Sequence, residues 1–150
     1  MMSNTKPILQ QIAGFTITGF SVRTCNRDEF DPGKAKIPAI WQQFYASDLA
    51  GKTPAFGVYA DYESDANGFY TLTAGIAENI VANALNSVNI QSGNYLVFKD
   101  TGPMPATVIA AWQQIWDYFA GKTNHKRNFL SDFEAYTAPN EISIYIGVDA

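Results

Sequence analysis

The sequence has a single cysteine among its 150 residues, Cys25, so it cannot form an intrachain disulfide. One thiol also excludes a metal site built from several cysteines. No segment approaches the roughly eighteen consecutive apolar residues of a membrane-spanning helix. Residues 1–11 lack the charged and then apolar pattern of a signal peptide. We therefore expect a cytoplasmic protein that does not bind membranes.

Charged residues are scarce as well, at 16% of the sequence, with ten Lys and Arg against fourteen Asp and Glu. The most basic segment is His125-Lys126-Arg127, whereas nucleic-acid binding needs a larger cluster of basic side chains that can contact several phosphates. We therefore expect no direct binding to nucleic acid. The net charge of −4 favours cationic partners instead.

Motifs for cofactors and metals are missing too. The glycines are scattered and form no phosphate-binding loop. Asp61, Glu63 and Asp65 lack the spacing and the final glutamate of a calcium loop, so we assign them to a hydrated turn. His125 has no second metal ligand nearby, and Cys25 has no evident partners for nucleophilic catalysis. We predict no cofactor, no metal and no catalytic residues.

Aromatic side chains, by contrast, are abundant. Hydrophobic residues make up 47% of the chain, which is enough for the core of one folded domain spanning residues 1–150. Phe, Tyr and Trp alone reach 14%, more than such a core needs when aliphatic residues are plentiful too. Because Tyr and Trp combine a large contact area with a polar group, this surplus indicates a binding surface.

The periodicity of the hydrophobic residues predicts the secondary structure. Alternation indicates strands, and a spacing of three or four residues indicates helices. The expected strands lie in the latter part of residues 8–23 and at residues 56–62, 69–76, 95–98, 132–137 and 142–146, and the expected helices lie at residues 37–45 and 108–119. Residues 78–91 have no clear period, and we predict an irregular connection there.

The order strand, helix, strand, strand occurs twice, which suggests a duplication. Trp41-Gln42-Gln43-Phe44 matches Trp112-Gln113-Gln114-Ile115 at a distance of 71 residues, with one match on each expected helix. We therefore predict an α+β fold made of two βαββ halves, residues 8–77 and 93–150, with an antiparallel sheet and two main helices. A central cleft between the halves would be the preferred place for a ligand.

A set of segments, in order along the chain, resembles the effector-binding domain of bacterial transcription activators of the AraC and MerR types, also called the gyrase-inhibitory-protein-like small-molecule-binding domain. The segments are residues 19–24 (GFSVRT), 37–44 (IPAIWQQF), 56–65 (FGVYADYESD), 68–71 (GFYT), 93–95 (GNY), 112–116 (WQQIW) and 132–136 (DFEAY). The sequence shows no helix-turn-helix, and it is therefore most similar to the single-domain versions of this family, some of which occur on integron cassettes.

This resemblance implies a pocket for amphipathic and often cationic organic molecules, used to sense or sequester them and linked to transcription regulation or to a multidrug response. It also implies a buried glutamate in the Phe-Glu-x-Tyr stretch, which is Glu134 here. Two other functions stay open: a protein–protein interaction module, gyrase-inhibitor-like or serving a regulator, and a hydrolase that uses Glu134 as a general base. We expect binding without catalysis, because no acid partner for Glu134 is evident.

The residues around Glu134 support part of this expectation without the family. Alternation places Glu134 and Tyr136 on the same face of residues 132–137. A carboxylate that faces a closed aromatic pocket is costly to ionise and gains from a bound cation. Spacing alone favours an exposed glutamate, or one paired with Arg23 or Arg127, whereas the resemblance favours the pocket.

The other candidate ligand contacts are aromatic side chains: Tyr59, Trp41, Tyr136, Tyr145, Tyr70, Trp112 and Phe44. Tyr59, Tyr136 and Tyr145 lie on strand faces opposite apolar neighbours, so we prefer them as companions of Glu134. The two tryptophans lie on apolar helix faces, where packing in the core is the usual role, and we rank Trp41 above Trp112. Tyr70 and Phe44 are equally compatible with core positions.

Overall fold

The computed structural model describes residues 6–51, 54–78, 80, 82, 84–121 and 123–149. Its elements, in chain order, are β1 (Ile8–Ile12), β2 (Phe15–Cys25), α1 (Asn26–Glu29), α2 (Ile37–Tyr45), β3 (Ala55–Ala60), β4 (Phe69–Ile76), β5 (Asn86–Ile90), β6 (Gly93–Thr101), α3 (Ala106–Ala120), β7 (Arg127–Ala138) and β8 (Glu141–Val148). The strands form one antiparallel sheet, and the predicted α+β class is therefore confirmed.

The order of the strands in the sheet is symmetric about its centre. It runs β1-β6-β8-β7-β3-β4-β2-β5. The first half of the molecule, β2 to β4 with α1 and α2, and the second half, β6 to β8 with α3, therefore meet at the β3–β7 pair. Each half places its last strand between its other two, as expected for two βαββ units related by an approximate two-fold axis.

Two strands that we did not predict, β1 and β5, flank the two halves. Each precedes one half in sequence but pairs with the first strand of the other half, β1 with β6 and β5 with β2. The prediction of an irregular connection at residues 78–91 is thus wrong for its last part. Only Val88 and Ile90 of β5 are apolar and turned inward, so this short, Asn-rich edge strand shows almost no alternation in sequence.

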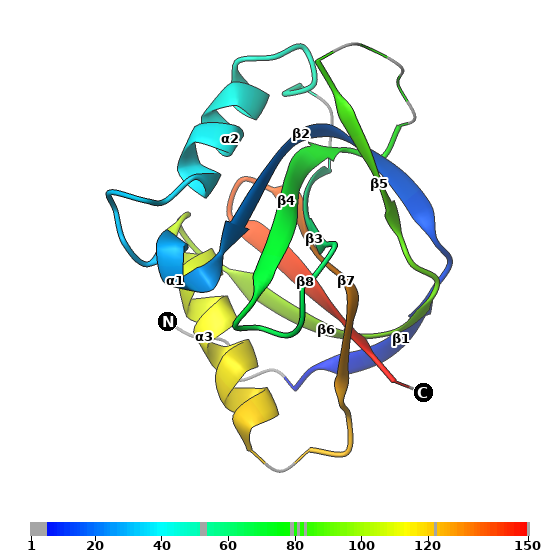
Figure 1. The fold of residues 1–150 in the computed structure, drawn as a ribbon. Coiled ribbons are helices and arrows are strands. Elements are labelled where there is room, and N and C mark those ends of the chain that lie inside the picture. Colours follow the sequence, from blue (N-terminus) through cyan, green and yellow to red (C-terminus); the bar gives the residue numbers. More distant parts are fainter. Residues whose placement is uncertain are drawn as a thin grey trace.

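The sheet is strongly curled. Ala13 and Gly14 alone link β1, at one end of the strand order, to β2, near the other end. In Figure 1 the links from β1 to β2 and from β5 to β6 lie on the side of the curl away from the helices. The interior of the curl is filled by one apolar cluster, which contains Ile17, Phe56, Val58, Ala60, Ile90, Tyr95, Phe133 and Ala135.

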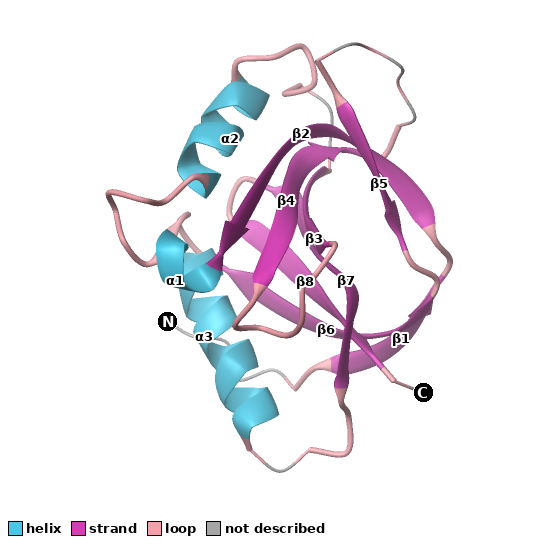
Figure 2. Ribbon diagram, in the orientation of Figure 1, coloured by secondary structure: helices cyan, strands magenta, loops and turns pink. Residues whose placement is uncertain are grey.

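The helices cover the other face of the sheet, as Figure 2 shows. Helix α2 packs on β2 and β4 around Phe44, and α3 packs on β6 and β8 around Ile115. Pro38 lies in the first turn of α2, where the missing N–H costs nothing. No helix in the described parts of the chain combines the length and apolarity needed to cross a membrane.

This arrangement leaves the central strands β3 and β7 without a helix directly above them. Both alternate. Val58 and Ala60 on β3 face the interior of the curl, and so does Phe133 on β7. Tyr59 and Glu134 therefore point to the face that carries the helices. The fold thus creates a space that is walled by α2 and α3 and floored by β3 and β7.

Candidate ligand-binding site

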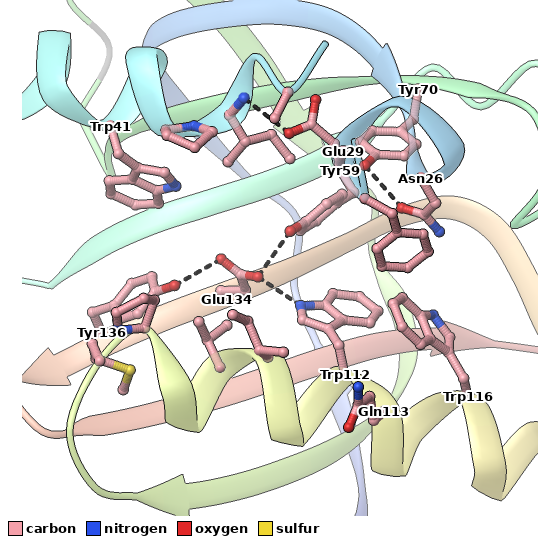
Figure 3. Close-up of a pocket in the computed structure, with 18 of the residues that line it drawn as sticks. Asn26, Glu29, Trp41, Tyr59, Tyr70, Trp112, Gln113, Trp116, Glu134 and Tyr136 are labelled. Atoms are coloured by element: carbon pink, nitrogen blue, oxygen red, sulfur yellow. Dashed lines mark hydrogen bonds between the residues drawn. The ribbon is translucent and has the colours of Figure 1, made fainter. Parts of the chain in front are cut away.

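A cavity of about 680 Å³ occupies this space, within the range of roughly 300–1,000 Å³ that is typical of sites for drug-sized molecules. Figure 3 shows it from the side, with α3 below and the first half above. Its lining is mostly apolar and aromatic and includes Phe30, Trp41, Tyr45, Tyr59, Tyr62, Tyr70, Met104, Val108, Ile109, Trp112, Trp116 and Tyr136. The polar residues of the lining are Asn26, Glu29, Gln113, Arg127 and Glu134.

The Glu134 carboxylate lies at the floor of the cavity and is only 3% exposed. Three neutral donors hold it. The Tyr59 hydroxyl and the Trp112 indole N–H donate to Oε2 at 2.9 and 2.7 Å, and the Tyr136 hydroxyl donates to Oε1 at 3.0 Å. The donors come from β3, α3 and β7, so both halves of the molecule orient the carboxylate (Figure 3).

A glycine makes room for this carboxylate. Gly57 lies directly opposite Glu134 in the β3–β7 ladder. A Cβ atom at Gly57 would stand 2.7 Å from Glu134 Oε1 and 3.0 Å from Trp41 Cζ2, closer than side chains tolerate. The absent side chain therefore lets Glu134 lie across β3 and lets Trp41 reach the cavity wall.

Burial dominates the electrostatics of the site. It raises the pKa of Glu134, and the hydrogen bonds from Trp112, Tyr59 and Tyr136 oppose that rise because they stabilise the charged form. Burial and the neighbouring carboxylate raise the pKa values of Tyr59 and Tyr136 well above the ordinary value, so both phenols remain protonated donors.

No Lys or Arg of the described residues forms an ion pair with Glu134. Arg127 instead pairs with Asp132 at 2.7 Å. Arg23 donates to the Thr71 hydroxyl and to a backbone carbonyl. The alternatives of an exposed Glu134 and of one paired with either arginine are therefore wrong: the carboxylate is buried and hydrogen-bonded, and none of the described residues is its counter-ion.

The structure brings six of the eight predicted site residues together around the cavity. They are Glu134, Tyr59, Trp41, Tyr136, Tyr70 and Trp112. Tyr70 donates from its hydroxyl to Asn26 Oδ1 at 2.9 Å and closes one end of the wall. Trp112, which we ranked below Trp41, lines the cavity as Trp41 does, and its N–H makes the shortest hydrogen bond to Glu134.

The other two predicted residues lie elsewhere. Tyr145 faces the interior of the curl, where its ring stacks on Phe133 with centroids 4.3 Å apart. The prediction failed because the apolar neighbours of Tyr145 on β8 pack against α3. Tyr145 therefore points to the opposite face of the sheet, into the apolar cluster that fills the curl. Phe44 is fully buried between α2 and the sheet and is a core residue.

Sequence reasoning also missed residues of the lining. Trp116 follows Trp112 by four residues on α3, so helical spacing places both on one face, and that signal was available. Asn26, Tyr62 and Arg127 are brought to the cavity by tertiary structure, and no pattern in the sequence marks them.

The rim of the cavity carries exposed apolar side chains. Phe30 is 69% exposed, Tyr45 61% and Ile109 56%, and all three line the cavity. The ring of Phe30 meets that of Trp116 edge-on, so residues of α3 and of the segment after α1 touch across the mouth. Such an apolar rim suits an amphipathic ligand that is only partly enclosed.

Comparison with known proteins agrees with this geometry. Residues 9–148 match the Cass2 family, described as "Integron-associated effector binding protein". The crystal structure of the integron cassette protein VCH_CASS2, from the mobile metagenome of Vibrio cholerae, is similar with a TM-score of 0.89 and 36% identity, over 96% of each chain.

Two other proteins match this chain more distantly, one in sequence and one in structure. YobU of Bacillus subtilis (strain 168), provisionally named a transcriptional regulator protein, is 28% identical in an alignment of 147 positions, and the match covers 87% of this chain and 89% of YobU. The structure of SAV2435 bound to tetraphenylphosphonium has a TM-score of 0.76 and 19% identity, over 97% of this chain and 95% of that one. The resemblance to effector-binding domains is thus confirmed, and the chain belongs to the Cass2 family of integron-associated effector-binding proteins.

Proposed function

We propose that this protein binds lipophilic organic cations in the cavity, with Glu134 as the counter-ion. One observation carries the proposal: Glu134 is only 3% exposed, and its carboxylate has three neutral donors but no cationic partner among the described residues. A buried carboxylate without a counter-ion is unfavourable, and a bound cation relieves that cost. The protein therefore selects ligands by charge.

The aromatic walls supply affinity without demanding one ligand shape. Trp41, Tyr59, Trp112 and Tyr136 surround the carboxylate. A cation over such a ring gains about 0.5–2 kcal/mol, depending on how far it is desolvated. The apolar rim formed by Phe30, Tyr45 and Ile109 would contact the hydrophobic substituents of the ligand.

The relatives support this reading. SAV2435, which shares the fold, is described as bound to tetraphenylphosphonium, a lipophilic cation. The family is one of effector-binding proteins, and the provisional name of YobU refers to transcriptional regulation. We propose that ligand binding serves sensing or sequestration, and that any effect on transcription passes through a partner protein rather than through direct contact with DNA.

The proposed role is binding without turnover. The described residues that line the cavity include no Ser, Cys, His or Lys that could act as a nucleophile beside Glu134. The donors to Glu134 are two phenols and an indole, and the raised pKa values of Tyr59 and Tyr136 make them poor acids. Unchanged ligand recovered after prolonged incubation is the expected result, and appearance of a product would overturn this part of the proposal.

A pair of ligands with one shape and opposite charges tests the proposal. Tetraphenylphosphonium and tetraphenylborate are titrated into the protein, and binding is followed through tryptophan fluorescence. We expect the cation to bind at least about tenfold more tightly than the anion, a difference of about 1.4 kcal/mol. Equal affinities, or no saturable binding of the cation, would overturn the proposal.

Glu134→Gln is the decisive variant, because Gln keeps the shape and can still accept from Trp112 and Tyr59. We expect its preference for the cation to fall about tenfold or more. Glu141→Gln, an exposed carboxylate of β8, is the matched control and should leave the preference unchanged. Acid neutralises Glu134, so the affinity of the native protein for the cation should also decrease as the pH is lowered. Because the pKa of Glu134 is raised, this decrease should begin at a pH above that at which an ordinary glutamate is protonated.

A further inference from the structure

The cavity carries a second charged residue, Arg127, that the proposed function does not use. Arg127 lines the cavity together with Tyr62, and its side chain is 8% exposed. Its guanidinium lies over the ring of Phe129 at 4.4 Å from the centroid and near the ring of Phe119 at 6.0 Å. Contact through the flat face of a guanidinium leaves the N–H groups at its edge free to donate.

Most of these N–H groups have no partner among the described residues. Of the five donors of an arginine, only one group is engaged: Nη2 donates to Asp132 Oδ2 at 2.7 Å. The Nε atom is buried and makes no hydrogen bond. A buried donor left unsatisfied is costly, and it shows that the protein compensates the charge of this guanidinium only in part.

The partner of Arg127, by contrast, has several donors. The Asp132 carboxylate is fully buried and also accepts from the Tyr62 hydroxyl at 2.6 Å and from the backbone N–H of Gly147 at 2.8 Å. Asp132 shares its charge among three donors, whereas Arg127 has a single acceptor among the residues that the structure describes. The guanidinium therefore keeps a positive potential that is available to the cavity.

The two charged ends of the cavity lie close together. Asp132 and Glu134 are two residues apart on one face of β7, a separation of about 7 Å along the strand. Arg127 is fixed at the Asp132 end by the ion pair, and Tyr59, which is paired with Asp132 in the ladder and donates to Glu134, lies between the two ends. A single small ligand can therefore reach both.

We infer that the guanidinium of Arg127 forms a second polar subsite, which binds an anionic or strongly accepting group of the ligand, so that the preferred ligands are amphoteric organic cations. This inference rests on the proposed function, because Glu134 binds the cationic centre. A carboxylate on the ligand, which Glu134 alone would repel, becomes favourable when it reaches Arg127. The ligand class is thus narrower than lipophilic cations in general.

Two probes that differ in one group test this inference. Decyldimethylbutylammonium is the plain cation, and decyldimethyl(3-carboxypropyl)ammonium replaces its terminal methyl by a carboxylate. Both are titrated by tryptophan fluorescence, and the measured quantity is the ratio of their affinities. We expect the carboxylated probe to bind about fivefold to tenfold more tightly than the plain cation. A carboxylated probe that binds no more tightly than the plain cation would overturn the inference while leaving the proposed function intact.

Variants assign the effect to Arg127. Arg127→Lys keeps the ion pair with Asp132 but loses the planar fork, so the preference for the carboxylated probe should fall about fivefold. The double variant Arg127→Met with Asp132→Asn removes both buried charges together, so no unpaired ion remains, and it should abolish the preference. Arg23→Lys, on β2 and outside the lining, is the matched control. Thermal unfolding verifies that each variant is folded.

Each outcome has a definite meaning. An equal fall in affinity for both probes in Arg127→Lys would show that Arg127 only supports the fold, and would overturn the inference. A preference that persists in the double variant would overturn it as well. Absence of binding of either probe to the native protein would overturn both the inference and the proposed function.

Discussion

The two halves of this molecule have the same architecture but different chemistry. Trp41 of α2 packs on Tyr136, and Trp112 of α3 packs on Tyr59, so each helix contributes a tryptophan that meets a tyrosine of the opposite half. All the buried charged residues of the described chain, Asp100, Arg127, Asp132 and Glu134, belong to the second half. The buried polar residues of the first half are threonines.

The central ladder shows how this difference arises. Gly57 pairs with Glu134, and Tyr59 pairs with Asp132. Glu134 of the second half therefore faces a glycine of the first half, which leaves space for the carboxylate, and Tyr59 of the first half donates a hydrogen bond to it. The two helices, one from each half, supply the tryptophans of the cavity wall. The duplicated architecture accounts for the shape of the cavity, and residues that differ between the two halves account for its charge.

The largest expected effect concerns the ion pair that only the second half contains. Asp132→Asn leaves Arg127 as an unpaired buried cation, and we expect it to lower the free energy of unfolding by about 3–5 kcal/mol. Asp61→Asn, an exposed carboxylate of the first half whose positive φ Asn also tolerates, should change it by less than about 0.5 kcal/mol. Urea unfolding measures both. Similar losses in the two variants would remove the contrast between the halves.

The two equivalent tryptophans should differ by a smaller amount. Trp112→Phe removes a hydrogen bond to a buried carboxylate, whereas the described residues provide no acceptor for the indole N–H of Trp41. We expect Trp112→Phe to cost about 1.5–3 kcal/mol more than Trp41→Phe in urea unfolding at neutral pH. The excess should shrink in acid, where Glu134 becomes protonated. Equal costs at neutral pH would mean that the indole N–H contributes nothing to the second half.

The smallest expected effect is a change in stability of opposite sign at the two carboxylates of β7: neutralising Asp132 should destabilise the protein, whereas neutralising Glu134 should stabilise it. Because burial raises the pKa of Glu134, the folded state holds its proton more tightly than the unfolded state does. Stability from this group is therefore complete in acid and is lost as the pH rises through the raised pKa.

Glu134→Gln should consequently be more stable than the native protein at neutral pH, by less than the cost of Asp132→Asn because three donors offset most of the burial penalty. The advantage should shrink as the pH falls and vanish below the ordinary pKa of a glutamate, where the carboxyl is protonated in both states. Thermal unfolding without ligand across this pH range is the measurement. A variant that is less stable than the native protein at neutral pH would contradict the buried, unpaired state of Glu134.

Alternation along strands predicted part of the site, and its failures have a physical cause. The same argument was applied to Tyr59 and Tyr145, since both face away from their apolar neighbours. It succeeded for Tyr59 because Val58 and Ala60 face the interior of the curl. It failed for Tyr145, which stacks on Phe133 in that interior. Alternation identifies two faces of a strand, but in a curled sheet with a core on each side it cannot tell which face lies toward the cavity.

The amino-acid sequence by itself determined the α+β class, the order of the two βαββ units and the face of β7 that carries Glu134, because these depend on the local periodicity of apolar residues. Tertiary structure alone decided that β1 and β5 cross to the opposite halves and that Gly57 lies against Glu134. It also decided that Arg127 pairs with Asp132 and not with Glu134, which has no cationic partner in the described part of the chain. These features depend on contacts between residues far apart in the chain, and the local spacing of residues does not predict such contacts.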